Sequence, residues 1–472
     1  MPSDELCWLS ALDLARLVRD KTVSPVEIVE QALARIARLN PSLNAYCTVA
    51  EEQAREAASA AEVSVMTGES LGPLHGVPLS IKDVVFTRRL RTTGGSRLFA
   101  EHEPEEDAVV TEWLKAAGAI ILGKTNTPAF GHKGLTDNAL FGPSRNPWDV
   151  SRTPGGSSGG AAAAVASGLG PLAVGTDGGG SIRVPASFCG IFGLKPSFGR
   201  VPEGPGFPGG WEMVGCTGPM TRRVRDAAAM LDVIAGPDDR DRHSLPADAG
   251  GPYLGACDAG VAGLSVGWSA DLGRARVDPA VAALCEDAAV RFESLGCHVE
   301  VVMPTWDDPE ETFRTLIAAE MYAAFADRLA DSEASLDRSM VALLRLGERV
   351  TAAQYLAAVE ARRVLWTDAQ RFLARFDVLL TPTAAVQPFA AAGPFPTEID
   401  GAPVSPLGWM PFTYPWNLTG QPAASVPVGF TEAGLPVGLQ IVGRRHGDRT
   451  VLAASAAFEA AAPWHERRPP GA

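Results

Sequence analysis

The chain has 472 residues, of which 46% are hydrophobic and 20% are charged, and it carries a formal net charge of −14. The apolar fraction is sufficient for a large buried core, which excludes a wholly disordered chain. Because 55 acidic residues outnumber 41 basic ones, the chain repels phosphate backbones and anionic membrane surfaces. We therefore expect neither a nucleic-acid partner nor a membrane partner.

The seven cysteines are thinly spread and include no C-x-x-C pair, so they indicate neither a disulfide framework nor a zinc site. The seven histidines likewise lack metal-ligand spacing. The first residues show neither the basic region nor the long apolar region of an export signal. We expect a cytoplasmic protein with reduced thiols and without metal or other cofactor, present as a monomer or a homodimer.

The first seventy residues have a helical pattern. Residues 24–27 form a capping box with Pro25 at the first helical position, apolar residues recur at helical spacing from Val29 to Ile36, and Asn40-Pro41 predicts the end of the helix. From residue 77, short apolar runs at 77–81, 119–122 and 172–174 alternate with helical segments such as 108–117. This alternation predicts an α/β fold with buried strands and helical crossovers.

The second half of the chain continues this pattern with longer helices. Helices are predicted at 279–295, 308–329, 352–376 and 449–458, strands at 299–302, 378–380 and 438–442, and a Pro- and Gly-rich surface loop at 393–408. We expect residues 1–472 to form one domain with a helical N-terminal part at 1–70, a core at 72–237, a helical elaboration with substrate-side loops at 238–410, and a return to the core at 411–472.

Two familiar motifs occur in contexts that argue against them. Residues 118–125 satisfy the spacing of a P-loop, but residues 119–122 have the pattern of a buried strand, and Pro128 interrupts the helix that must follow. Residues 155–159 satisfy the spacing of a nucleophile elbow, but the prolines within 146–154 leave no strand leading into the turn. We therefore expect neither a nucleotide site nor such an elbow.

Two clusters of glycine and serine, at 154–160 and 175–185, carry the remaining chemistry. Glycines beside a serine let backbone N–H groups converge on one point, as an oxyanion site requires, which makes Ser181 a candidate nucleophile. Its base is a neutral lysine if burial in the apolar run 77–81 lowers the pKa of Lys82. From this segment alone an ordinary salt-bridged lysine is the simpler interpretation, since Asp83 is adjacent, although neighbours in a strand point to opposite faces.

Three segments in order carry a resemblance: Gly-Val-Pro-Leu-Ser-Ile-Lys-Asp at 76–83, Gly-Gly-Ser-Ser-Gly-Gly at 155–160 and Gly-Gly-Ser-Ile-Arg-Val-Pro-Ala at 179–186. With the similar stretch 417–427, they resemble the amidase signature family over most of the chain. Lys82 precedes Ser157 by 75 residues and Ser157 precedes Ser181 by 24, which fits the family's Ser-Ser-Lys triad. The resemblance implies the amidase signature fold, a single large α/β domain with a central mixed twisted β-sheet surrounded by many α-helices.

The resemblance also implies roles for individual residues. Ser181 attacks the carbonyl and forms the acyl-enzyme, Ser157 relays its proton, and neutral Lys82 accepts it. The backbone amides of Gly178, Gly179, Gly180 and Ser181 hold the oxyanion. A cis peptide bond is expected between Gly156 and Ser157, Ser158 is expected to be structural, and Asp177 and Arg183 are expected to form buried scaffolding hydrogen bonds.

The family includes stand-alone acylamidases and urethanases, and also the glutamine-hydrolysing A subunit of a tRNA-dependent amidotransferase. This chain carries Trp211 and Met213 where small polar residues would suit glutamine. We favour a stand-alone hydrolase of an amide, anilide or carbamate with an aryl or bulky apolar group, with ester cleavage also expected, and keep the amidotransferase role open as the alternative. The candidate pocket walls are Trp211, Met213, Trp409, Met410, Phe412 and Trp416, although core packing explains these side chains equally well.

Overall fold

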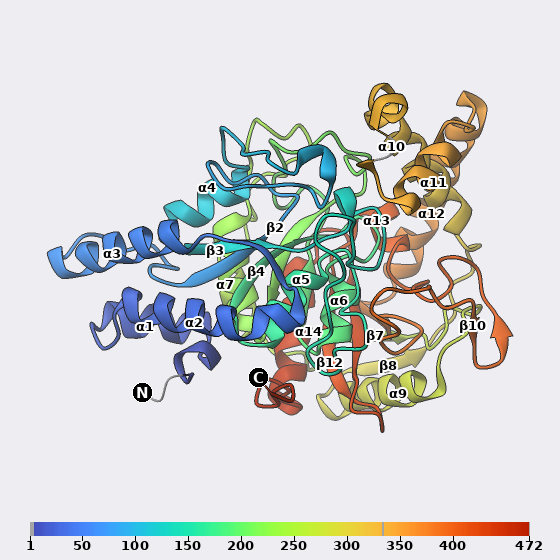
Figure 1. Cartoon of the computed structure of the whole chain (residues 1–472). Coiled ribbons are helices and arrows are strands. Elements are labelled where there is room, and N and C mark those ends of the chain that lie inside the picture. The colour runs from blue at the N-terminus through green and yellow to red at the C-terminus, as the bar shows by residue number, and fades with distance from the viewer. Residues whose placement is uncertain (1–3, 333–334, 472) are drawn as a thin grey trace.

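The structure is a computed structural model that describes residues 4–332 and 335–471. Its centre is a mixed eleven-stranded sheet in the order β1-β3-β2-β4-β6-β5-β12-β13-β9-β7-β8, with helices packed around it (Figure 1). The strands are β1 (Tyr46–Val49), β2 (Pro78–Lys82), β3 (Ile120–Thr125), β4 (Leu172–Thr176), β5 (Phe192–Lys195), β6 (Thr217–Thr221), β7 (Ser265–Trp268), β8 (His298–Val301), β9 (Val378–Pro382), β12 (Ala423–Phe430) and β13 (Pro436–Gly443). The predicted mixed α/β fold is confirmed.

The direction of the strands brings the carboxyl ends of β2 and β4 together at one edge of the sheet. Strands β3, β2 and β4 run parallel, as do β9, β7 and β8, whereas the strands between these two groups pair antiparallel. Because β2 and β4 are parallel neighbours, their carboxyl ends meet at the same edge. Strand β2 ends at Lys82 and β4 ends at Thr176. This edge carries the candidate site.

Helices pack along the central sheet and also form a group at each end of the molecule (Figure 1). In Figure 1, α1 to α3 lie at one end and α10 to α12 lie at the other. The helices are α1 (Ala11–Arg19), α2 (Pro25–Leu43), α3 (Glu51–Thr67), α4 (Val109–Ala116), α5 (Gly159–Ala166), α6 (Arg183–Cys189), α7 (Val224–Ile234), α8 (Tyr253–Ala256), α9 (Pro279–Ser294), α10 (Glu310–Ser332), α11 (Arg338–Gly347), α12 (Ala352–Leu373), α13 (Pro415–Thr419) and α14 (Asp448–Ala461). The helices predicted in the second half are confirmed as α9, α10, α12 and α14.

Three local predictions differ from the structure. The N-terminal part at 1–70, expected to be helical, also contains strand β1, which pairs with β3 at the edge of the sheet. Helix α2 has the predicted capping box, but it continues through Pro41 to Leu43 instead of ending at Asn40-Pro41. A proline this close to the end removes one donor from the last turn, and the Asn40 side chain accepts bonds from the next two amides, of Ala45 at 2.9 Å and Tyr46 at 2.8 Å. The predicted loop 393–408 contains a short hairpin of β10 (Glu398–Ile399) and β11 (Ala402–Pro403).

Helix α5 holds the first glycine and serine cluster in the core. Its sequence, Gly-Gly-Ala-Ala-Ala-Ala-Val-Ala, is buried on every side, so it has no polar face that a helical periodicity would reveal. The small side chains permit close approach: a Cβ on Gly160 would lie 2.5 Å from the Asn126 backbone nitrogen. The tight packing of α5 fixes the position of Ser157, two residues before the helix begins.

Candidate active site

Lys82 and Ser157 are brought into direct contact at the carboxyl edge of the sheet. The Lys82 Nζ atom donates hydrogen bonds to Ser157 Oγ at 2.7 Å and to Thr176 Oγ1 at 2.8 Å. The Lys82 side chain is completely buried. The parallel pairing of β2 and β4 accounts for this arrangement, since it places the last residues of both strands beside one another. Lys82 thus meets two hydroxyls while its own side chain is shielded from bulk water.

Burial decides the charge of Lys82. It lowers the pKa of the ammonium to about 7, against the opposing effect of the negative charges of Asp177 and Glu203. Asp83 points elsewhere: its carboxylate accepts bonds from the Thr93 amide at 3.1 Å and the Gly95 amide at 3.4 Å. The expectation that neighbouring strand residues face opposite sides is confirmed. Burial therefore favours the uncharged amine of Lys82 near neutral pH.

The segment around Ser157 departs from an ordinary turn. The Gly156–Ser157 peptide bond is cis, as predicted. Gly131 packs directly against the side chain: a Cβ at that position would lie 3.2 Å from Ser157 Oγ and 4.0 Å from Lys82 Nζ, in a backbone with φ +73°. Only a glycine fits beside the hydroxyl without displacing it.

Ser158 forms hydrogen bonds to the backbone through both its side chain and its amide. Its Oγ donates to the Thr176 carbonyl at 3.1 Å, and its amide donates to the Ser181 carbonyl at 3.1 Å. The second bond ties the loop before α5 to the loop before α6. Ser158 therefore has the structural contacts that were expected of it.

The loop from Gly178 to Ser181 lies between β4 and α6, and Ser181 is half-buried. The Gly180 amide donates to Asp177 Oδ1 at 2.7 Å, so this predicted oxyanion donor is already engaged. Within the described residues, the amides of Gly178, Gly179 and Ser181 have no hydrogen-bond acceptor. Three of the four predicted donors are thus free to bind an oxygen.

Asp177 and Arg183 form the buried scaffold that was expected. Both side chains are inaccessible, and the Arg183 guanidinium donates to Asp177 Oδ2 at 3.0 Å and Oδ1 at 2.9 Å. Burial alone would raise the pKa of Asp177, but the Arg183 charge and its hydrogen bonds hold that pKa below its usual range. Arg183 also donates to Asn417 Oδ1 at 2.6 Å and Gln440 Oε1 at 2.7 Å. This network joins the serine loop to α13 and β13.

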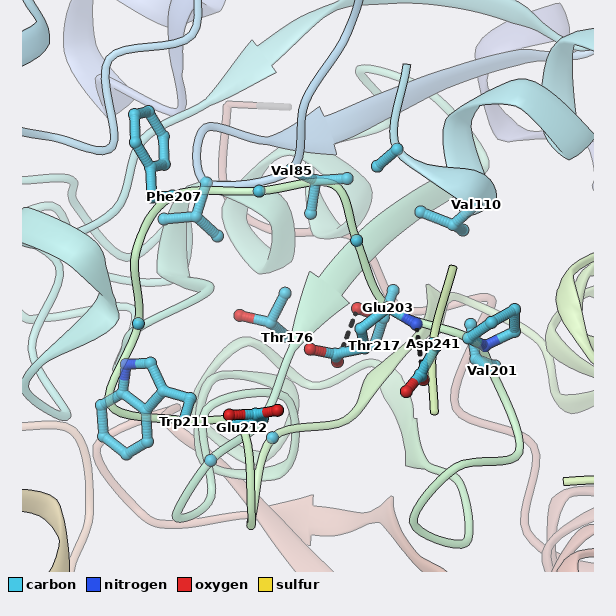
Figure 2. Close-up of a pocket in the computed structure, with 18 of the residues that line it drawn as sticks. Val85, Val110, Thr176, Val201, Glu203, Phe207, Trp211, Glu212, Thr217 and Asp241 are labelled. Atoms are coloured by element: carbon cyan, nitrogen blue, oxygen red, sulfur yellow. Dashed lines mark hydrogen bonds between the residues drawn. The ribbon is translucent and has the colours of Figure 1, made fainter. Parts of the chain in front are cut away.

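A cavity of about 510 Å³ opens over the site, with Ser157, Thr176 and Ser181 in its lining. Figure 2 shows the Trp211 and Phe207 side chains on one side of this space and Val110 and Val201 on the other, with Glu203 between them. Much of the wall is supplied by the segment 198–215 and by the loop 239–243. The cavity therefore combines apolar side chains with charged ones, which include Glu203, Glu212 and the residues of the loop 239–243.

The structure separates the six predicted pocket side chains. Trp211 lines the cavity, and its Nε1 donates to the Phe130 carbonyl at 3.0 Å. The other five do not belong to this lining: Met213 and Trp416 pack in one hydrophobic cluster, and Trp409, Met410 and Phe412 in another. An apolar wall and an apolar core have the same composition, so the residue types alone did not distinguish them.

The structure shows what the P-loop-like and elbow-like sequences form instead. Residues of the P-loop-like sequence lie in strand β3, where the fully buried Lys124 donates to Thr87 Oγ1 at 2.9 Å and to the Val85 carbonyl. No strand precedes the elbow-like sequence at 155–159, although α5 follows it. In the described part of the chain, no group of three or more metal-ligating side chains was found and no helix is long and apolar enough to cross a membrane.

Sequence reasoning missed three residues of the site, namely Gly131, Thr176 and Glu203. Thr176 could have been found from its position at the end of a parallel strand, next to the strand that carries Lys82. Gly131 and Glu203 lie in irregular segments with no periodicity, so nothing in the sequence indicated their proximity to the serines.

Comparisons with known proteins identify the family of the chain. The sequence model described as Amidase matches residues 27–452, and the chain therefore belongs to the amidase signature family of hydrolases. An acylamidase from Rhodococcus erythropolis is 41% identical over 99% of this chain and 98% of its own length. The crystal structure of a bacterial aryl acylamidase of the same family superposes with a TM-score of 0.91 at 36% identity, covering 97% of both chains. The A subunit of the glutamyl-tRNA(Gln) amidotransferase of Moorella thermoacetica is 38% identical over 98% of this chain and 99% of its own length.

Proposed function

We propose that the chain is a stand-alone hydrolase of C–N bonds adjacent to a carbonyl, with Ser181 as nucleophile, Ser157 as proton relay and Lys82 as base. The observation that carries this proposal is the 2.7 Å hydrogen bond between Lys82 Nζ and Ser157 Oγ, in a site where burial favours the uncharged amine. A neutral amine has the lone pair that a general base requires, whereas an ammonium has none. Ser157 and Ser181 line the same cavity, so a substrate in that cavity lies within reach of both hydroxyls.

The reaction then proceeds in two halves. Ser181 Oγ bonds to the carbonyl carbon while its proton passes to Ser157 Oγ, whose own proton passes to Lys82 Nζ. The carbonyl oxygen becomes an oxyanion, which the amides of Gly178, Gly179 and Ser181 stabilise. The C–N bond breaks, the amine leaves with a proton returned from Lys82 through Ser157, and an ester remains on Ser181. Water attacks this ester by the same proton route and releases the acid.

The lining of the cavity favours a substrate with an aryl or bulky apolar group. Phe130, Phe207 and Trp211 offer aromatic surface beside the serines, and Val85 and Val110 extend it. Aryl amides, anilides and aryl carbamates present the reacting carbonyl together with such a group, and esters require less protonation of the leaving group. The names of the acylamidase and aryl acylamidase relatives support this substrate class.

Hydrolysis of glutamine within an amidotransferase is the second candidate. The observation in its favour is the 38% identity to the Moorella thermoacetica protein. Against it, Trp211 covers the loop of the nucleophile: a Cβ on Gly178 would lie 2.3 Å from the indole. A large apolar side chain at this position suits an aryl group better than the polar side chain of glutamine.

The test uses the purified chain without ATP, metal or a second polypeptide. We expect turnover of a 4-nitroanilide or an aryl carbamate, no turnover of glutamine, and covalent labelling of Ser181 by a sulfonyl fluoride. Ser181→Ala removes the attacking oxygen, so activity should fall by at least about 10³-fold while circular dichroism stays native. The Ser158→Ala variant is the matched control and should still be labelled at Ser181. Unchanged turnover by Ser181→Ala would refute the mechanism, and a requirement for a second polypeptide would favour the amidotransferase role.

A further inference from the structure

Glu203 places a carboxyl group in the wall of the active-site cavity. Its Oε1 accepts a hydrogen bond from Thr217 Oγ1 at 3.1 Å, and its backbone amide donates to Asp241 Oδ2 at 2.9 Å (Figure 2). Thr217 pairs across the sheet with Thr176, the threonine that is bonded to Lys82. The carboxyl group is therefore held in a fixed position close to the reacting groups.

One oxygen of this carboxyl group lacks a side-chain partner. Within the described residues, no side-chain donor reaches Glu203 Oε2, whose neighbourhood includes Gly215, another residue of the cavity lining. A Cβ on Gly215 would lie 3.5 Å from this oxygen. Because Glu203 is only half-buried, this side of its carboxyl group can accept a hydrogen bond from a donor that a ligand brings into the cavity.

The arginines around the cavity pair with other carboxylates, and in the part of the chain that the structure describes only the more distant Lys82 charge acts favourably on Glu203. Arg240 pairs with Glu112 and Asp238, each at 2.8 Å, and Arg242 pairs with Glu212 at 2.6 Å. Among the described side chains, none forms an ion pair with Glu203, since even Lys82 Nζ lies beyond 4.0 Å. Burial raises the pKa of Glu203 to about 7 with the help of the Asp241 charge, although the Thr217 hydroxyl, the Thr217 backbone amide and the Lys82 charge oppose this rise. This part of the cavity is therefore short of positive charge.

The apolar side chains near Glu203 limit the kind of cation that can bind beside it. In Figure 2, Val110 and Val201 lie on one side of the Glu203 carboxyl group, and Phe207 and Trp211 lie across the space from it. A small inorganic cation would remain poorly coordinated among such side chains. An organic ammonium carried on an apolar body fills the volume and also supplies N–H donors.

We propose that Glu203 binds an ammonium group of the substrate, so that the preferred substrates are amides with an apolar or aryl body and a primary amine remote from the scissile bond. This inference rests on the proposed function for the position of the scissile bond. The binding of the amine itself requires no chemical step. A carboxylate and an ammonium in hydrogen-bond contact attract each other strongly where water is largely excluded.

The experiment compares two ligands that differ only in their polar tip, 4-phenylbutylamine and 4-phenylbutan-1-ol, by isothermal titration calorimetry at pH 8, where an alkyl amine is still charged. We expect the wild-type chain to bind the amine about tenfold more tightly than the alcohol, as one charge-assisted hydrogen bond allows. Glu203→Gln should abolish this preference, whereas Glu432→Gln, a control at an exposed carboxylate on the β12–β13 turn, should keep it.

Three further variants keep the inference falsifiable. Glu203→Asp retains the charge and should retain a preference for the amine, whereas Glu203→Leu removes the charge and replaces Glu203→Gln as the test if the glutamine variant does not fold. Equal affinity for both ligands in the wild-type chain, or the same preference in wild type and Glu203→Gln, would overturn the inference. Ser181→Ala should bind the amine as wild type does, so that loss of turnover with intact amine preference marks a failure of the proposed mechanism alone.

Discussion

Replacing Lys82 by methionine should stabilise the fold while it abolishes activity. A lysine with a pKa of about 7 in the folded chain and about 10.4 in the unfolded chain costs roughly 4 kcal/mol of stability at pH 7 and about 2 kcal/mol at pH 9. The sign follows from proton binding: between these two pKa values the unfolded chain holds more protons, so the stability of the wild-type chain rises with pH. Below pH 7 the whole penalty is present.

The variant loses favourable contacts as well. The bonds from Lys82 Nζ to Ser157 Oγ and Thr176 Oγ1 contribute about 1 kcal/mol each, and methionine cannot make them. Lys82→Met should therefore be more stable than wild type by about 2 kcal/mol at pH 7 and about equally stable at pH 9. Other buried lysines, Lys124 and Lys195, are present in both proteins, so their titration cancels in the comparison.

Equilibrium urea unfolding at pH 7 and pH 9 measures this difference. Lys21→Met, at an exposed lysine, is the control and should show a difference from wild type that does not change between the two pH values. If the difference between wild type and Lys82→Met is also the same at both pH values, Lys82 does not titrate near neutrality in the folded chain, and the reasoning on its charge fails.

Two predictions concern the rate of the reaction. The kcat/KM for an uncharged anilide should rise with pH to a plateau with a midpoint near pH 7, because only neutral Lys82 accepts the proton; Lys82→Arg, whose guanidinium stays charged, should be inactive throughout. A rate independent of pH between 6 and 9 would contradict this. Gly131→Ala should lower kcat by about 10- to 100-fold because its Cβ would lie 3.2 Å from Ser157 Oγ. The matched control is Gly142→Ala, which has a similar φ of +77° but no atom within 4 Å of the added Cβ, and equal rates in the two variants would exclude the steric explanation.

The sequence by itself determined the class of fold and the family. Apolar runs of strand length at 77–81, 119–122 and 172–174 became β2, β3 and β4, because buried parallel strands need continuous apolar sequence. The order and spacing of three short motifs identified the amidase signature family, which the family match supports. Helix α5 escaped prediction since it is buried on every side and carries no periodic polar face.

Only the tertiary structure decided the electrostatics and the shape of the site. The charge of Lys82 depends on complete burial and on Asp83 facing the Thr93 and Gly95 amides, and both follow from how neighbouring segments pack. The cavity wall comes mostly from irregular loops, in which no pattern of residues records which side chains converge. Trp211 and Trp416 are therefore equivalent in the sequence, but Trp211 lines the cavity and Trp416 packs in the core. The burial of Lys82 and the meeting of distant side chains in one cavity arise only when the chain is folded. For that reason the partners of Lys82 and the position of Glu203 could be found only from the three-dimensional structure.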